Sequence, residues 1–111
     1  MTYNLSCRLF TDAKCFGPGV AQLLHAVQEL HSLRAAALSM DMAYSKAWTI
    51  VRRCEAALGF QLLVYTTGGK NGGGAALTQE GQDLLDAYNR YCRRLRDQAD
   101  ALFREEFGAF L

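Results

Sequence analysis

The sequence predicts a mainly α-helical fold with one small β-hairpin and a long last helix. Three consecutive features support this prediction. Residues 44–58 have the apolar spacing of a helix with a basic face, and residues 60–66 have the composition of a strand. A glycine-rich loop follows, and another helix begins after it. A helix followed by a glycine-tipped hairpin is the arrangement of recognition helix and wing in a winged helix-turn-helix.

Length and composition indicate one globular domain. The chain has 111 residues, of which 50% are hydrophobic and 21% are charged, as in ordinary folded domains. No stretch approaches the roughly 18 consecutive apolar residues of a membrane span, and the first residues lack the features of a secretory signal. We therefore expect a cytoplasmic protein that makes no membrane contact.

The charged side chains are unevenly distributed along the chain. The formal net charge is +1, but residues 1–77 hold seven basic against four acidic side chains, and residues 78–111 hold five against seven. The more positive part contains the candidate recognition helix. We expect residues 1–77 to form the helix-turn-helix part, with a wing at about 62–77. Residues 78–111 are expected to be a dimerisation helix of the same single domain.

The cysteines and histidines show no metal-ligand spacing. Cys7, Cys15, Cys54 and Cys92 form no C-x-x-C pair. Cys54 and Cys92 fall on apolar helix faces, which is typical of buried free thiols. No nucleophile–base pair or pair of catalytic carboxylates stands out either. We expect no metal, no cofactor and no enzymatic activity.

The N-terminal part predicts a strand and two helices. Residues 4–16 alternate partly between apolar and polar, which indicates a strand followed by a turn around Asp12. Pro18 suits the start of a helix that is buried on one face. The apolar residues of that face are Val20, Leu23, Leu24, Val27 and Leu30. Ser32 is placed to cap the alanine-rich helix that follows, and Asp41 stands where the turn needs a left-handed residue.

Residues 44–58 form the candidate recognition helix. Its buried stripe is expected at Ala47, Val51, Cys54 and Leu58. The other faces carry hydroxyl and basic side chains, which suit phosphates and base edges in a major groove. These candidate DNA contacts are Tyr44, Ser45, Lys46, Thr49, Arg52 and Arg53. A solvated helix face would show the same pattern, and Tyr44 and Trp48 would equally suit packing beneath the wing.

Gly59 is expected to end this helix, and a strand and the glycine-rich loop follow it. The loop is not a phosphate-binding P-loop, because Val64 and Asn71 occupy positions that require glycine and a hydroxyl residue. A disordered linker is the alternative to a hairpin. Apolar residues flank the loop on both sides, however, which favours the hairpin. Its tip residues Lys70 and Asn71 are then candidates to contact the DNA backbone or minor groove.

Thr78 is placed to cap a last helix of about 30 residues, which would be about 45 Å long. A small domain cannot cover that length. The apolar residues of this helix fit a heptad-like seam over about three repeats. They are Leu84, Tyr88, Tyr91, Leu95 and Leu102. The exposed part of the seam needs a partner, and the simplest one is the same helix of a second copy.

Two segments carry a resemblance to a known family. AYSKAW at residues 43–48 and TGGKNGGGAALTQEGQDLL at residues 67–85 resemble the N-terminal DNA-binding domain of ModE-type molybdate-responsive regulators. More broadly, A-L-G at residues 57–59 and L-T-x-x-G at residues 77–81 are similar to LysR-type winged-helix domains. The resemblance covers roughly residues 17–107.

The resemblance implies that the second and third helices and the wing contact DNA, and that the long helix dimerises. By position it places these residues at the contact: Tyr44, Ser45, Lys46, Thr49, Lys70 and Asn71. The oxyanion-binding domains of ModE-type regulators have no counterpart before Leu111. We therefore expect a ModE-like regulator that lacks the molybdate-binding domain.

The leading hypothesis is a transcriptional regulator that reads a palindromic DNA site as a homodimer. Lys46, Arg53 and Lys70 would bind phosphates, while Ser45, Thr49 and Tyr44 would read base edges. The alternative is a winged-helix protein–protein interaction module without specific DNA binding, which the near-neutral net charge favours. Double-stranded DNA and a second copy are thus the expected partners. The sequence does not identify an effector.

Overall fold

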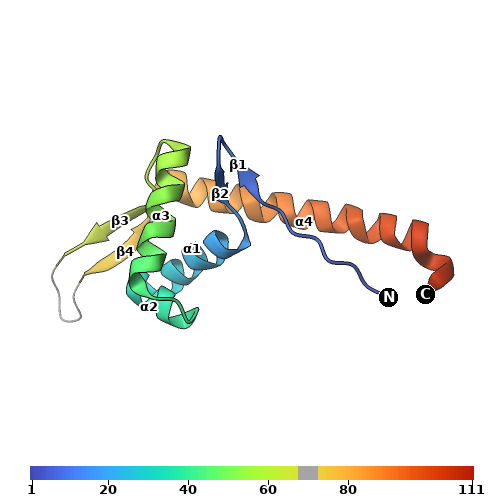
Figure 1. Cartoon of the computed structure of the whole chain (residues 1–111), viewed down its shortest axis with the longest axis horizontal. Coiled ribbons are helices and arrows are strands. Elements are labelled where there is room, and N and C mark those ends of the chain that lie inside the picture. The colour runs from blue at the N-terminus through green and yellow to red at the C-terminus, as the bar shows by residue number, and fades with distance from the viewer. Residues whose placement is uncertain (68–72) are drawn as a thin grey trace.

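Three short helices pack together at one end of a much longer fourth helix, and a β-hairpin projects from this group (Figure 1). The computed structural model describes residues 1–67 and 73–111. The elements of this part of the chain, in order, are β1 (Leu9–Phe10), β2 (Lys14–Phe16), α1 (Pro18–Leu30), α2 (Leu33–Ser39), α3 (Tyr44–Leu58), β3 (Leu63–Thr66), β4 (Gly74–Leu77), α4 (Gln79–Phe107) and the 3-10 turn η1 (Gly108–Phe110). The predicted class, mainly α with a small hairpin and a long last helix, is confirmed.

The core lies between α1, α2, α3, the base of the wing and the first turns of α4. Its largest fully buried side chains are Phe16, Leu23, Leu24, Val27, Val51, Cys54, Leu62, Leu63 and Leu85. The alanines of α2 allow close packing, because Ala36 and Ala37 are completely buried against their neighbours. Leu30 was predicted in the buried stripe of α1, but it is 45% exposed. It is the last residue of α1 and extends beyond the core.

Local chain chemistry sets the helix ends as predicted. Pro18 occupies the first turn of α1. The Ser32 hydroxyl caps α2 by accepting a hydrogen bond from the amide of Ala35 at 3.0 Å. Asp41, in the turn between α2 and α3, has a left-handed φ of 53°. Gly59 ends α3 with a φ of 83°, a conformation that strongly favours glycine.

The N-terminal region differs from the single strand predicted over residues 4–16. Its strand segments are limited to β1 and β2, which pair as a small antiparallel hairpin around the predicted turn at Asp12. Residues 1–8 instead run back along α4 (Figure 1). They are held there by aromatic and polar contacts, including the ring of Tyr3 against that of Phe103 at 5.2 Å. Packing against α4 replaces strand pairing in this segment.

The wing is an antiparallel hairpin of β3 and β4, in which Leu63 faces Leu77 and Thr66 faces Gly74. Its first strand begins at Leu63, three residues later than the predicted residue 60. At this point the amides of Leu62 and Leu63 are bound by a side chain of α3. The candidate tip residues Lys70 and Asn71 lie outside the described residues.

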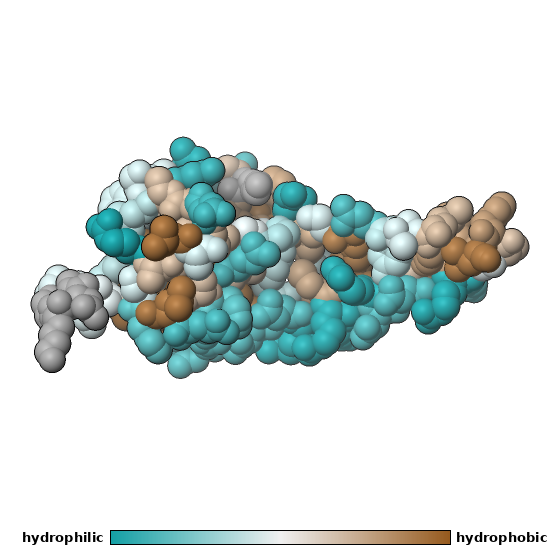
Figure 2. All heavy atoms as spheres, turned by 90° about the horizontal axis from the view of Figure 1, so that it is seen from below, coloured by the Kyte–Doolittle hydropathy of each residue, from teal (hydrophilic) through white to brown (hydrophobic). Residues whose placement is uncertain are grey.

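Helix α4 has 29 residues and gives the molecule its principal extents of 60 × 28 × 21 Å. Its first turns belong to the core, whereas its C-terminal half extends beyond it. Figure 2 shows hydrophobic surface gathered at the far end of this helix, where Phe107 and Phe110 are exposed. None of the described helices is long and apolar enough to cross a membrane.

Tyr88 of α4 belongs to the chain's own core. It is 6% exposed, packs edge-on against Phe16 at 5.0 Å, and donates a hydrogen bond to the carbonyl of Cys7 at 2.7 Å. Tyr88 was predicted to lie in a seam between two copies. Apolar periodicity alone cannot tell which part of a stripe faces the chain's own core, and the structure removes Tyr88 from that seam.

We predict that Tyr88 makes stability depend on alkaline pH. Burial raises the pKa of the Tyr88 phenol from its ordinary value of 10.0 to about 12. The neutral phenol is therefore favoured in the folded state. Its contribution to the stability of the fold is complete below pH 10 and is lost as the pH rises toward 12. At pH 8, Tyr88→Phe should destabilise the chain by about 0.5–1.5 kcal/mol, because it removes one buried hydrogen bond.

Thermal melts followed by circular dichroism from pH 8 to 11.5 measure this effect. The difference between wild type and Tyr88→Phe should shrink above pH 10. Leu38→Ala is the control, since Leu38 is an exposed residue of α2 outside the core and its variant should follow wild type throughout. A gap between wild type and Tyr88→Phe that stayed constant with pH would contradict the prediction.

Candidate nucleic-acid interface

The outward face of α3 carries the hydroxyl and basic residues that the sequence singled out. Ala47, Val51 and Cys54 bury the opposite face in the core. Because these three fix the rotation of the helix, the positions on its opposite side point away from the core. The exposed candidate residues are Ser45, Lys46, Thr49, Arg52 and Arg53, while Tyr44 is half-buried. The described part of the predicted site therefore shares one helix and lies on or beside its outer face.

Thr49 lies at the centre of this face. Its hydroxyl donates a hydrogen bond to the carbonyl of Ser45 at 2.9 Å, one turn earlier. The hydroxyl proton is therefore used in this hydrogen bond to the backbone. The hydroxyl lone pairs and the methyl group remain for an external group, and a threonine methyl suits contact with the thymine methyl.

A cleft of about 300 Å³ separates the first turns of α2 and α3 from the outer part of the wing hairpin. Tyr44 and Trp48 line it together with Tyr65 of β3. The guanidinium of Arg34 lies 4.2 Å from the ring centre of Tyr44, which is a cation–π contact. Tyr44 thus packs at the edge of the cleft, whereas Trp48 keeps an exposed surface beside the wing.

Arg34 is a basic residue of this region that was not selected from the sequence. It is exposed on α2, two positions after the Ser32 cap, and lines the same cleft. The signal that could have identified it is its place as the single basic residue of an alanine-rich helix. Its guanidinium adds positive charge next to the outward face of α3.

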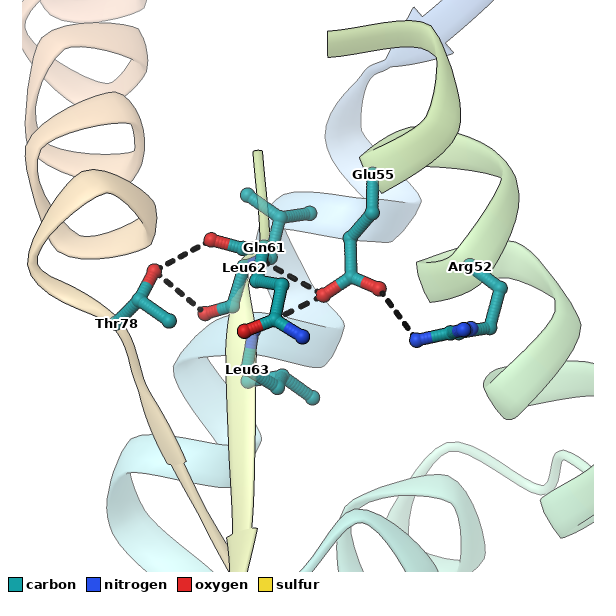
Figure 3. A network of polar contacts seen from close by, with 6 residues as sticks. All are labelled: Arg52, Glu55, Gln61, Leu62, Leu63 and Thr78. Atoms are coloured by element: carbon teal, nitrogen blue, oxygen red, sulfur yellow. Dashed lines mark hydrogen bonds and ion pairs between the residues drawn. The ribbon is translucent and has the colours of Figure 1, made fainter. Parts of the chain in front are cut away.

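Glu55 joins α3 to the wing (Figure 3). Its side chain is 8% exposed, and its Oε2 atom accepts hydrogen bonds from the amides of Leu62 at 2.7 Å and Leu63 at 3.3 Å. Its Oε1 atom has no hydrogen bond and lies 3.5 Å from Nη1 of Arg52. Glu55 was not selected from the sequence either, although it directly follows Cys54 in the buried stripe, where a carboxylate is unexpected.

Thr78 holds the same segment from the side of α4 (Figure 3). Its hydroxyl donates to the carbonyl of Gln61 at 2.6 Å and accepts from the amide of Gly81 at 2.9 Å. Its amide donates to the carbonyl of Leu62 at 2.9 Å. The approach is so close that a Cβ on Gly81 would lie 2.5 Å from the Leu62 oxygen. Glycine is therefore required in the first turn of α4.

Two titratable groups on or near α3, Cys54 and Tyr65, have raised pKa values. Burial raises the pKa of the Cys54 thiol from 9.0 to about 12, and this thiol donates to the carbonyl of Cys15. Cys54 is thus a protonated core residue, unlike a reactive thiolate. Burial likewise raises the pKa of Tyr65. Among the described residues, no three His, Cys, Asp or Glu side chains are placed to hold a metal ion.

The residues predicted to form the dimer seam differ in how exposed they are along α4. Leu84 and Leu95 are half-buried, and Leu84 packs against the core. Tyr91 and Leu102 are 53% and 57% exposed. Because Tyr88 faces the core, the apolar surface of the seam that remains exposed begins at Tyr91 and continues toward the C-terminal end of the helix.

Comparison with known proteins identifies relatives of this arrangement. The family model described as "Bacterial regulatory helix-turn-helix protein, lysR family" matches residues 20–82. These residues span α1 from Val20 onward, α2, α3, the wing and the first turn of α4.

Two curated relatives are regulators. The chain is 32% identical over 106 residues to the transcriptional regulator ModE of Haemophilus influenzae, a match that covers 96% of this chain and 39% of the relative. It is 32% identical over 89 residues to the DNA-binding transcriptional dual regulator ModE of Escherichia coli K12, covering 80% of this chain and 32% of the relative. The chain thus spans less than half the length of either relative. These matches confirm the resemblance to ModE-type and LysR-type regulators.

Two solved structures share the fold. The CbnR_DBD chain of a CbnR_DBD–DNA complex superimposes with a TM-score of 0.57 at 23% identity, over 82% of this chain and 95% of that one. ArgP from Mycobacterium tuberculosis superimposes with a TM-score of 0.55 at 27% identity, over 81% of this chain and 31% of that one. At 23% identity, the match to CbnR_DBD supports the fold alone.

We predict that Thr78→Ala will destabilise the chain by about 0.5–2 kcal/mol, the usual effect of losing an N-cap. The alanine removes the acceptor for Gly81 and the donor to Gln61. Thr78→Ser retains the hydroxyl and should recover most of the loss. Urea unfolding followed by circular dichroism measures both variants. An alanine variant as stable as wild type would show that this cap does not hold the wing.

Proposed function

Because the chain belongs to the lysR family of bacterial regulatory helix-turn-helix proteins, we propose that it binds double-stranded DNA and regulates transcription. One observation supports this proposal most strongly. The outward face of α3 is free of core contacts, carries hydroxyl and basic side chains, and lies beside a cleft that α3 shares with the wing. A helix of this kind fits the major groove, while a wing can follow the adjacent backbone.

We assign different tasks to the residues of α3. Ser45 and Thr49 read base edges, because short hydroxyl side chains at the centre of the face can approach them closely. Lys46 and Arg53 bind phosphates on one side of the groove. Tyr44 reaches the groove only at its edge, since it is half-buried and covered by Arg34. Lys70 and Asn71 are proposed to contact the backbone or minor groove from the wing.

We further propose that two copies pair through α4. Tyr91, Leu95 and Leu102 supply the exposed part of the seam, and Leu84 supplies its half-buried beginning. A two-fold dimer places two α3 helices on the same face of the duplex, about 34 Å or a multiple of it apart. The site read by such a dimer is palindromic. Access to chromosomal DNA makes the cytoplasm the proposed location.

A protein–protein interaction module is the second candidate. The net charge of +1 and the exposed apolar end of α4 favour it. The two candidates differ in one property, since phosphate binding releases counterions and makes affinity depend steeply on salt.

We predict that affinity for a duplex selected from a random library falls linearly with salt on a log–log plot. Lys46→Ala should make the slope less negative by about 0.9 for each phosphate that the variant no longer binds. Arg104→Ala, far from α3 on α4, is the control and should leave the slope unchanged. Fluorescence anisotropy at several salt concentrations measures both variants. A flat wild-type slope, or no duplex binding at low salt, would favour the interaction module.

We predict that Leu102→Asp converts the dimer into a monomer, because it places two charges in the seam. Sedimentation velocity at several concentrations measures this change. Leu38→Asp is the control, as Leu38 is a leucine of α2 that is still more exposed than Leu102. A Leu102→Asp chain that sedimented like wild type would remove α4 from the interface.

A further inference from the structure

Two neighbouring arginines of α3 have different surroundings. Arg52 lies 3.5 Å from the Glu55 carboxylate, and its guanidinium lies 5.4 Å from the ring centre of Trp48. Arg53 makes no ion pair with any described residue. Arg52 is thus restrained by two side chains of its own helix, whereas Arg53 is free to meet an external anion.

The carboxylate of Glu55 needs Arg52. Its Oε1 atom is buried and receives no hydrogen bond among the described residues, and the Arg52 guanidinium supplies the ion pair that the structure gives it (Figure 3). A buried charge without a partner is costly, so removal of one member of such a pair destabilises the fold. A phosphate that drew Arg52 away would leave Oε1 uncompensated and uncover the Trp48 ring.

Glu55 in turn determines where the wing begins. Buried backbone amides need acceptors, and those of Leu62 and Leu63 find theirs in Oε2 instead of a neighbouring strand. The wing strand β3 starts at this point. Together with the Thr78 contacts from the side of α4, this carboxylate of α3 therefore sets the direction in which the wing leaves the domain.

We infer that Glu55 is a positioning residue for DNA binding, and that Arg52 serves as its counter-ion and not as a phosphate contact. Glu55 fixes the base of the wing relative to α3, so both can engage one duplex together. The inference rests on the proposed function and revises the role that the sequence suggested for Arg52. Of the two neighbouring arginines, it assigns the phosphate contact to Arg53.

Substitution of each arginine by methionine tests the inference, because methionine keeps much of the volume but provides no charge and no donor. Arg52→Met should lower the melting temperature by at least about 4 °C and leave the salt slope of duplex binding unchanged. Arg53→Met should do the reverse, with an unchanged melting temperature and a slope less negative by about 0.9 per phosphate. Arg52→Lys, which keeps the charge, should restore most of the wild-type melting temperature.

The dependence on Glu55 is tested by a double-mutant cycle. In a Glu55→Gln background the carboxylate charge is absent, so adding Arg52→Met should lower the melting temperature little further. If Arg52→Met lowers the melting temperature as much in the Glu55→Gln background as in wild type, the inference is overturned. An Arg52→Met chain that keeps the wild-type melting temperature would also overturn it. The same holds if the salt slope of Arg52→Met becomes less negative, as that of Arg53→Met should.

Failure of the inference is distinguishable from failure of the proposed function. If wild type binds no duplex with a salt-dependent affinity, the proposed function fails, and no DNA-binding role remains for Glu55. If wild type binds with a steep slope and Arg52 contributes to it, the proposed function stands and the role assigned to Arg52 is overturned.

Discussion

The structure depends on how the short segment of residues 61–63 is held between two helices. From α3, the Glu55 carboxylate accepts hydrogen bonds from two amides of the segment. From α4, Thr78 binds two of its carbonyls, and Gly81 allows an approach that any side chain would block. The far strand of the wing is also fixed, because the amide of Ala75 donates to the carbonyl of His31 at 3.0 Å. The hairpin therefore leaves the domain in a direction set by α1, α3 and α4 together.

This attachment connects the core to the proposed function. Burial of Ala47, Val51 and Cys54 determines which side of α3 faces outward, and the junction determines where the wing lies relative to that side. The hydrophobic core thus sets the geometry of the proposed DNA-binding surface without touching the DNA itself. Arg34 and Arg53 extend that surface toward α2 and along α3, while Arg52 stabilises the junction.

Much of the fold could be predicted from the sequence, because its signals are local. Helix periodicity, the Ser32 and Thr78 caps, the left-handed Asp41 and the terminating Gly59 all depend on residues a few positions apart. The remainder depends on contacts between distant residues. Residues 1–8 follow α4 instead of forming a strand, and Tyr88 faces Phe16 instead of a second copy. Glu55 was missed because its partners Leu62 and Leu63 belong to the next element.

The central claim is that α3 and the wing form one DNA-binding surface. Amide chemical shifts of the labelled chain, recorded as a selected duplex is added, test this claim most directly. We expect the largest changes at residues 45–53 and in the strands 63–66 and 74–77, with little change at residues 96–107. Changes concentrated along α4, with the amides of residues 45–53 unaffected, would contradict the claim.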